Sequence, residues 1–189
     1  MIVVLVEGNG DKRSLPPLLQ GQSDEPVQCI DMKGKSNIVR HPRGFEDTVR
    51  RQWALGRRLF IVLVDGDVTS APYNTIDQEK SDLFRRAERL AQELQITVQV
   101  CWAVLEMESW LIGGIQSRST YCGLREVGRI PANTEIFPPD PNRWLQDHLR
   151  STYGPHIQEC LSQHIDLNAA SRCNQSLQDF LATVRQVTS

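Results

Sequence analysis

Carboxylates follow three separate apolar stretches of the chain. Glu7 comes directly after the first stretch, and Asp65 and Asp67 come after the second. Glu106 and Glu108 follow the third. If folding brings these acids together, their mutual repulsion raises their pKa values unless a cation neutralises them. Hard oxygen ligands without an accompanying His or Cys cluster favour Mg²⁺, with Mn²⁺ as a common substitute. The pattern therefore predicts a divalent-metal site.

The stretches that precede these acids are typical of buried parallel strands. They are rich in Val, Ile and Leu without a regular polar alternation, as expected where helices cover both faces of a sheet. The predicted strands are Ile2–Val6, Leu59–Val64, Ile96–Leu105 and, with a weaker pattern, Val27–Met32.

Segments with helical periodicity alternate with these strands. Apolar residues recur at helical spacing in Phe45–Arg57 and in Gln78–Leu94. Asp11–Gln20 carries its leucines on one side, and the two prolines within it are acceptable only near its first turn. The alternation of strand and helix predicts an α/β fold with a mostly parallel sheet for residues 1–112.

Residues 113–189 have a different character. Gly113–Gly114 ends the alternation, and an irregular, proline-rich bridge follows. Helical patterns return at Asn142–Leu149, Ile157–Gln163 and Gln175–Val187, with Asn174 or Ser176 as an N-cap. This region is expected to form a helical extension that covers one end of the sheet.

The predicted sheet determines where the acids lie. The carboxyl ends of parallel strands meet at one edge, where open α/β sheets bind their ligands. Residues two apart on an extended chain point to the same side, so Asp65 with Asp67, and Glu106 with Glu108, should each act as a pair. Taken singly, each acid also has a structural interpretation, such as the capping of a helix N-terminus by Asp11.

The composition is that of a soluble protein. The chain has 189 residues and a formal net charge of −2, and no apolar run approaches the roughly 18 residues that a membrane-spanning helix needs. No basic leader precedes the first strand, so we expect no signal peptide. The 5 cysteines are scattered too widely for a disulfide framework or a zinc ribbon. These features predict a reducing, cytoplasmic setting.

The order of the motifs resembles the Toprim family. Glu7-Gly8 after the first strand and Asp65-Gly66-Asp67 after a later one are similar to the family's Glu and Asp-x-Asp pattern. The resemblance is closer to the overcoming-lysogenization-defect (OLD) nucleases and to short stand-alone Toprim-like proteins. Their pattern includes an acid such as Asp11 and a Glu-x-Trp-Leu element, here Glu108-Ser109-Trp110-Leu111. The resemblance covers residues 1–112 and is loose beyond them.

The resemblance implies a Toprim-like (Rossmann-like) fold and a nuclease that hydrolyses phosphodiester bonds of DNA or RNA with one or two Mg²⁺ ions. The implied metal ligands are Glu7, Asp11, Asp65, Asp67 and one or both of Glu106 and Glu108, and the first four are also the implied catalytic residues. OLD nucleases carry an ATPase ahead of this module, whereas this chain contains no G-x-x-x-x-G-K-[ST] loop. A separately encoded ATPase, in a defence-type system, is therefore an expected partner.

Basic residues gather in the segment 33–58, where Lys and Arg clearly outnumber Asp and Glu. A local basic surface binds phosphates through a salt-sensitive, sequence-independent attraction, so we expect contact with nucleic acid. Lys33 and Lys35 are candidates for a cation at the site, and Lys35 is assigned a catalytic role. The alternative for both is an ordinary solvated loop lysine.

Two other hypotheses explain the same acids. One is a non-catalytic Toprim-like subunit that regulates or interacts by binding nucleic acid or an ATPase. The other is a receiver-like signalling domain, which needs an acidic pair after its first strand and a single Asp after its third. This chain has the reverse arrangement, so the receiver ranks last.

Overall fold

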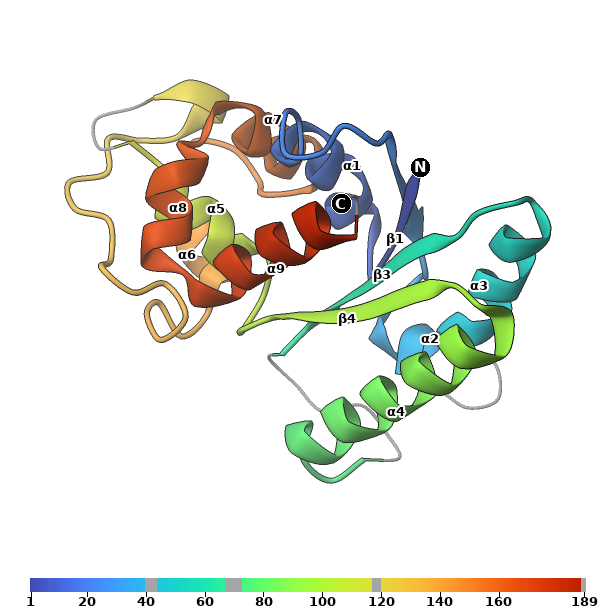
Figure 1. Ribbon diagram of the computed structural model, residues 1–189. Coiled ribbons are helices and arrows are strands. Elements are labelled where there is room, and N and C mark those ends of the chain that lie inside the picture. The colour runs from blue at the N-terminus through green and yellow to red at the C-terminus, as the bar shows by residue number, and fades with distance from the viewer. Residues whose placement is uncertain (40–43, 67–72, 117–119, 188–189) are drawn as a thin grey trace.

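Four apolar stretches form a single parallel sheet. The structure, a computed structural model, describes residues 1–39, 44–66, 73–116 and 120–187. The strands in these ranges are β1 (Ile2–Val6), β2 (Val27–Asp31), β3 (Leu59–Asp65) and β4 (Thr97–Ala103). They pair in parallel in the order β2-β1-β3-β4 (Figure 1). The predicted α/β fold is confirmed, and the arrangement is consistent with a Toprim-like fold.

Helices cover both faces of the sheet (Figure 1). One face packs on α2 (Lys35–Val39), α3 (Phe45–Ala54) and α4 (Ile76–Leu94). On the other face, α1 (Asn9–Leu18) contacts β2 and α9 (Gln175–Gln186) contacts β4. The helices that pack on α1, on α9 and on one another within the same hydrophobic cluster are α5 (Glu108–Gly114), α6 (Pro141–His148), α7 (Pro155–His164) and α8 (Leu167–Cys173). Val3 and Leu5 of β1 contact the first group of helices, and Val4 contacts the second. Because both sets of side chains are buried, the strand is apolar at every position.

The two prolines of α1 correct one prediction. Pro16 and Pro17 lie in the last turn of the helix, not near its first turn. A proline there removes the N–H that would bond to the carbonyl four residues earlier. Those carbonyls belong to Lys12 and Arg13, which are exposed, so water can bind them instead.

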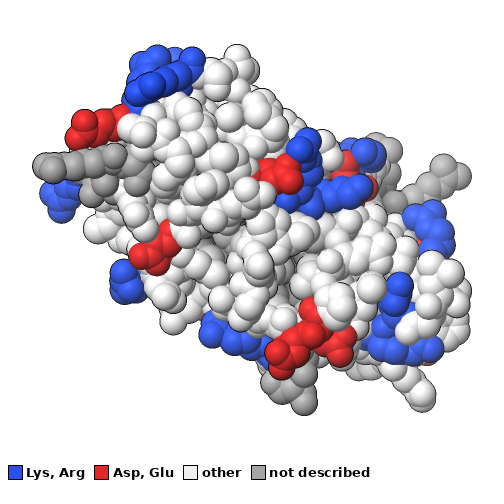
Figure 2. Space-filling view, turned by 90° about the horizontal axis from the view of Figure 1, so that it is seen from above, with Lys and Arg blue, Asp and Glu red and all other residues white. Residues whose placement is uncertain are grey.

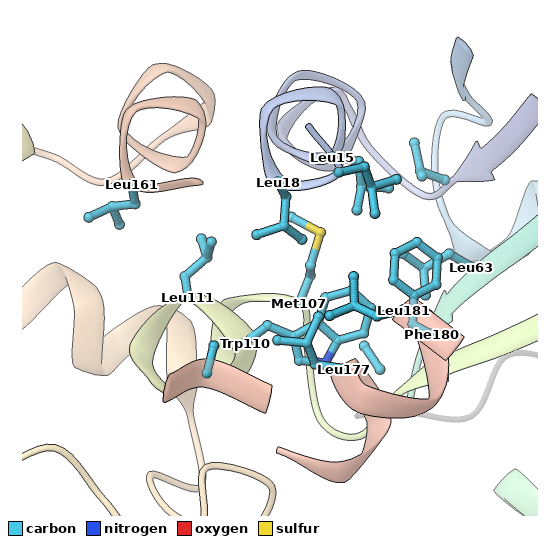
Figure 3. Close-up of a cluster of buried hydrophobic side chains, with 14 of the residues drawn as sticks. Leu15, Leu18, Leu63, Met107, Trp110, Leu111, Leu161, Leu177, Phe180 and Leu181 are labelled. Carbon is cyan, nitrogen blue, oxygen red and sulfur yellow. The ribbon is translucent and has the colours of Figure 1, made fainter. Parts of the chain in front are cut away.

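The C-terminal region contacts the sheet through α9, which lies on β4 and is linked to α5, a helix that the sequence pattern did not predict. Trp110 of α5 is completely buried, stacks on Phe180 of α9 at 5.2 Å between ring centroids, and donates its indole N–H to Ser176 Oγ at 3.0 Å. Figure 3 shows Trp110 among apolar side chains that include Leu177. Gly113–Gly114 lies inside α5, where a Cβ on Gly114 would be 2.7 Å from Ile165 Cβ. These glycines, the last two residues of α5, allow close helix packing, and among the described residues only helices follow them, so the alternation of strand and helix ends there as predicted.

One pair of cysteines is joined, which corrects the expectation of a chain without disulfides. Cys122 lies on the 3₁₀ helix η1 (Tyr121–Gly123), and its disulfide partner Cys160 lies on α7. The pair is formed because η1 packs against α7, a contact that cysteine spacing does not reveal. The cytoplasmic setting stays a prediction. In the described ranges, no helix combines the length and the apolar character that crossing a bilayer requires.

Candidate functional site

A cleft of about 710 Å³ lies at the carboxyl-terminal edge of the sheet. Its walls come from the loops that follow β1, β2 and β4, from the end of β3, and from the starts of α6 and α7. The carboxylates that line it are Glu7, Asp11, Asp31, Asp65, Glu106 and Glu108. The parallel topology therefore gathers five of the six predicted acids in one cleft, together with one that was not predicted.

Glu7 and Asp65 are linked directly because β1 and β3 are neighbours in the sheet. Glu7 Oε1 accepts a hydrogen bond from the backbone N–H of Asp65 at 2.8 Å. Asp65 Oδ1 in turn accepts from the N–H of Met107 at 3.1 Å, which connects it to the segment after β4. Gly66 allows the end of β3 to lie close to the end of β4: its N–H donates to the carbonyl oxygen of Ala103 at 2.8 Å, and a Cβ on residue 66 would be only 3.0 Å from the same oxygen. Backbone donors thus orient both carboxylates.

Asp11 lies in the first turn of α1 and has both a structural partner and a partner across the cleft. Its Oδ2 accepts from the N–H of Gly8 at 3.1 Å, which is the capping interaction considered for it. Its Oδ1 accepts from Nε2 of Gln158 on α7, also at 3.1 Å. Burial raises the pKa of Asp11, and the hydrogen bonds from Gln158 and Gly8 oppose the rise. Helix capping and membership of the acidic cluster therefore coexist.

Glu106 and Glu108 both reach the cleft, but not as the extended pair that was predicted. β4 ends at Ala103, Leu105 turns the chain with a φ of 63°, and Glu108 is the first residue of α5. Glu106 Oε2 accepts from the N–H of Asn142 at 3.3 Å. The prediction of the pairing geometry is wrong because the strand is shorter than the apolar pattern suggested.

Glu108 is the most buried acid of the cleft, with a residue exposure of 8%. Its Oε1 accepts a hydrogen bond from the hydroxyl of Tyr153 at 3.1 Å. Burial raises its pKa to about 7, and the negative charges of Asp11 and Glu106 contribute to the rise. Burial and the Glu108 carboxylate also raise the pKa of Tyr153, so the phenol remains a donor. The repulsion between these acids is the condition that a bound cation would relieve.

Asp31, at the end of β2, is the acid that sequence reasoning missed. It accepts hydrogen bonds from the backbone N–H of Lys33 at 2.7 Å and from its ammonium at 2.6 Å. Burial favours a higher pKa for Asp31, but these hydrogen bonds outweigh it and the pKa is lowered. Its position after an apolar stretch was the available signal, although that stretch had the weakest strand pattern. Lys33 brings a positive charge to the cleft wall.

Lys35 has a different location. Its side chain is buried, and its ammonium donates to the backbone carbonyl of Asp65 at 2.6 Å and pairs with Glu79 of α4 at 3.1 Å. It does not belong to the cleft wall among the described residues. Lys35 therefore supports the end of β3 from the α4 side, and its catalytic role stays a prediction.

The donor chemistry of the cleft fits a hard divalent cation. The described residues that line it supply carboxylate oxygens from separate chain segments and include neither His nor Cys. Asp67, the remaining predicted ligand, lies outside the described residues. Within the described part of the chain, no three of the carboxylates bring oxygens within 4.8 Å of one another. With the side chains in these positions, at most two of the described carboxylates could contact one ion directly. A third carboxylate would come from Asp67 or from a small movement of another side chain of the cleft.

The predicted basic segment is partly neutralised. Arg50 donates to both carboxylate oxygens of Glu93, at 2.8 and 2.7 Å, and Lys33 is paired with Asp31. Arg40 and Arg43 lie outside the described residues. On the described part of the face in Figure 2, basic and acidic side chains are interspersed and separated by uncharged surface. Contact with nucleic acid therefore stays a prediction.

Comparisons with known proteins add a structural similarity. No protein-family model matches the chain, and no curated protein matches it significantly in sequence. The structure is similar to the C-terminal region of the Burkholderia pseudomallei OLD protein, with a TM-score of 0.47 and 14% identity. The match covers 100% of this chain and 98% of that one.

Proposed function

We propose that the protein is a divalent-metal-dependent phosphodiesterase that hydrolyses nucleic acid. The observation that supports this most is the convergence of six carboxylates on one cleft at the carboxyl edge of the sheet. Acids from β1, β3 and the segment after β4 reach it because parallel strands end together. The assignment of nucleic acid as the substrate depends on the resemblance of the motifs to the Toprim family.

Four of the proposed ligands, Glu7, Asp11, Asp65 and Glu106, accept a hydrogen bond from a backbone N–H group. Glu7 and Asp65 would hold Mg²⁺ or Mn²⁺, and Asp11 and Glu106 would complete the set. Asp67, which lies outside the described residues, is the fifth proposed ligand on the basis of its sequence position. When bound, the cation would neutralise the acids and stabilise the negative charge that develops on the phosphoryl group.

Glu108 has a different proposed role, that of a general acid or base. Burial, the largest cause, raises the pKa of Glu108 toward neutral pH, and burial persists when a cation neutralises Asp11 and Glu106; a carboxyl group with a raised pKa transfers protons efficiently near neutral pH. The hydroxyl of Tyr153 holds Oε1 in place, so the other side of the carboxyl group would receive or deliver the proton. The attacking water and the leaving oxygen of the phosphodiester are the two groups it could serve.

The test begins with the metal alone. Mn²⁺ binding is measured by electron paramagnetic resonance for the wild-type protein and for Asp65→Asn, with Asp24→Asn as the control because Asp24 is exposed and lies outside the cleft wall. We expect Asp65→Asn to lower the Mn²⁺ affinity at least tenfold and the control to leave it unchanged. Equal affinities in all three proteins would contradict the proposed metal site.

Cleavage is then assayed on single- and double-stranded DNA and RNA with Mg²⁺ or Mn²⁺, with and without a genomically neighbouring ATPase. We expect chelation or Asp65→Asn to abolish cleavage. If no substrate is cleaved and nucleic-acid binding survives Asp65→Asn, the non-catalytic regulatory subunit becomes the better description.

A further inference from the structure

Two side chains of the C-terminal region reach the acidic cluster from across the cleft. Gln158 of α7 donates from Nε2 to Asp11 Oδ1 at 3.1 Å, over a sequence separation of 147 residues. Tyr153, just before α7, donates its hydroxyl to Glu108 Oε1 at 3.1 Å. Both residues line the cleft. The same short stretch of chain therefore contacts two acids that follow different strands, Asp11 after β1 and Glu108 after β4.

Gln158 is held firmly in this position. Only 4% of the residue is exposed, and α7 lies against α1 (Figure 1). A Cβ on Gly10 would be 1.9 Å from Gln158 Oε1, so the amide fits over the first turn of α1 only because residue 10 is glycine. Arg13 and Glu159 form an ion pair between the same two helices at 2.5 Å. The amide thus has little freedom to leave Asp11.

A glutamine is an unusual choice for packing two helices together. Burying an amide is costly unless its polar atoms are hydrogen-bonded, and an apolar side chain of similar volume would fill the space without that cost. The bond to Asp11 offsets part of the cost. It also fixes the plane of the carboxylate, because Gly8 N–H and Gln158 Nε2 bind its two different oxygens.

We propose that Gln158 and Tyr153 are positioning residues that hold the carboxylates of Asp11 and Glu108 in the orientation needed for metal binding and hydrolysis. This inference rests on the proposed function of the cleft. It makes the C-terminal region part of the site, because Gln158 of α7 and Tyr153 before it supply side-chain hydrogen-bond donors to two acids of residues 1–112. Neighbours that orient metal-binding side chains typically change metal affinity or activity by about 10–100-fold when they are removed.

The test compares variants that remove a donor and preserve volume. Gln158→Met removes the amide, and Tyr153→Phe removes the hydroxyl alone. The matched controls are Gln163→Met, on the exposed side of α7, and Tyr121→Phe, a half-buried tyrosine that does not line the cleft. Urea unfolding first establishes that each variant is folded, and Mn²⁺ affinity of the folded protein is then measured by electron paramagnetic resonance.

We expect Gln158→Met to lower the Mn²⁺ affinity about tenfold or more, because Asp11 is a proposed ligand. Tyr153→Phe should leave the Mn²⁺ affinity unchanged and lower the rate of Mn²⁺-dependent cleavage about tenfold or more, because its partner Glu108 is the proposed proton-transfer group. The controls should remain within twofold of the wild type in both measurements. If Gln158→Met binds Mn²⁺ and Tyr153→Phe cleaves as the wild type does, the inference is overturned and the metal site survives. If the wild-type protein binds no Mn²⁺, the proposed function and this inference fail together. Should Gln158→Met not fold, Tyr153→Phe, a minimal change, still tests the inference through the cleavage rate.

Discussion

Replacing Glu108 by Gln should make the protein more stable at neutral and alkaline pH. Burial raises the pKa of Glu108 from its usual 4.5 to about 7, with further contributions from the charges of Asp11 and Glu106. One pKa unit corresponds to about 1.4 kcal/mol, so keeping this carboxylate ionised costs the folded state about 3 kcal/mol. Gln cannot ionise, and its amide oxygen can still accept the hydrogen bond from Tyr153.

The direction in which the free energy of unfolding changes with pH follows from the number of protons that each state binds. Between pH 4.5 and about 7 the unfolded chain has lost the Glu108 proton while the folded protein retains it. Over this range the free energy of unfolding of the wild type falls as the pH rises, and the contribution becomes constant above pH 7. Glu108→Gln lacks this loss, so the two proteins should be about equally stable near pH 4.5 and differ by up to about 3 kcal/mol at pH 8.

The assay is urea unfolding in a metal-free buffer from pH 4.5 to 8, with the disulfide intact. Glu88→Gln, on the exposed surface of α4, controls for the exchange of a Glu for a Gln. The difference between variant and wild type is interpreted, because it cancels the titrating groups that do not interact with Glu108; the replacement also relieves the repulsion from Asp11 and Glu106, which acts in the same direction. Parallel stability curves for Glu108→Gln and the wild type would refute the reasoning that burial and neighbouring charges destabilise the ionised carboxylate.

Two further predictions concern elements that support the cleft. Arg86 donates to both carboxylate oxygens of the buried Glu46 at 2.6 Å, so Arg86→Met should cost about 3–5 kcal/mol in guanidinium unfolding, because it leaves that charge only the exposed Arg89 at 4.0 Å as a partner. The added change Glu46→Leu should recover most of the loss, and a single-variant cost below about 1 kcal/mol would contradict the reasoning. Replacing Cys122 and Cys160 by Ser opens a loop with a sequence separation of 38, which should lower the stability by about 2–4 kcal/mol. An unchanged melting temperature, compared with the oxidised wild type, would argue against a stabilising disulfide.

The strands and the location of the acids were predictable because both depend on local patterns. A strand buried on both faces must be apolar at nearly every position, and this pattern is visible in residues such as Ile2–Val6. Once strands alternate with helices, right-handed crossovers make the sheet parallel and its carboxyl ends meet. Glu7, Asp65 and Glu106 therefore reach one cleft for a reason that is present in the chain itself.

The helix α5 was not predictable in the same way. Glu108 to Gly114 is a short helix with apolar residues on all sides, and it is buried because it lies between the sheet, α8 and α9. Its residues show no amphipathic pattern, so no helix was predicted there. The apolar run to Leu105 also extended the predicted strand two residues beyond Ala103, where β4 ends. As a result, the two acids were predicted to lie on an extended chain directly after the strand rather than in a loop and at a helix start.

The chain alone determined the sheet and the edge at which its acids collect, since those follow from the burial of neighbouring residues. The packing of α7 on α1 determined the contact of Gln158 with Asp11, and the position of the segment before α7 gave Glu108 its partner Tyr153. The packing of η1 on α7 brought Cys122 and Cys160 together. Packing likewise placed the Lys35 ammonium against Glu79 rather than in the cleft. The physical reason is distance along the chain. The burial of a strand or helix shows in the types of neighbouring residues, whereas the hydrogen bond between Gln158 and Asp11, 147 residues apart, depends on how whole helices pack against each other.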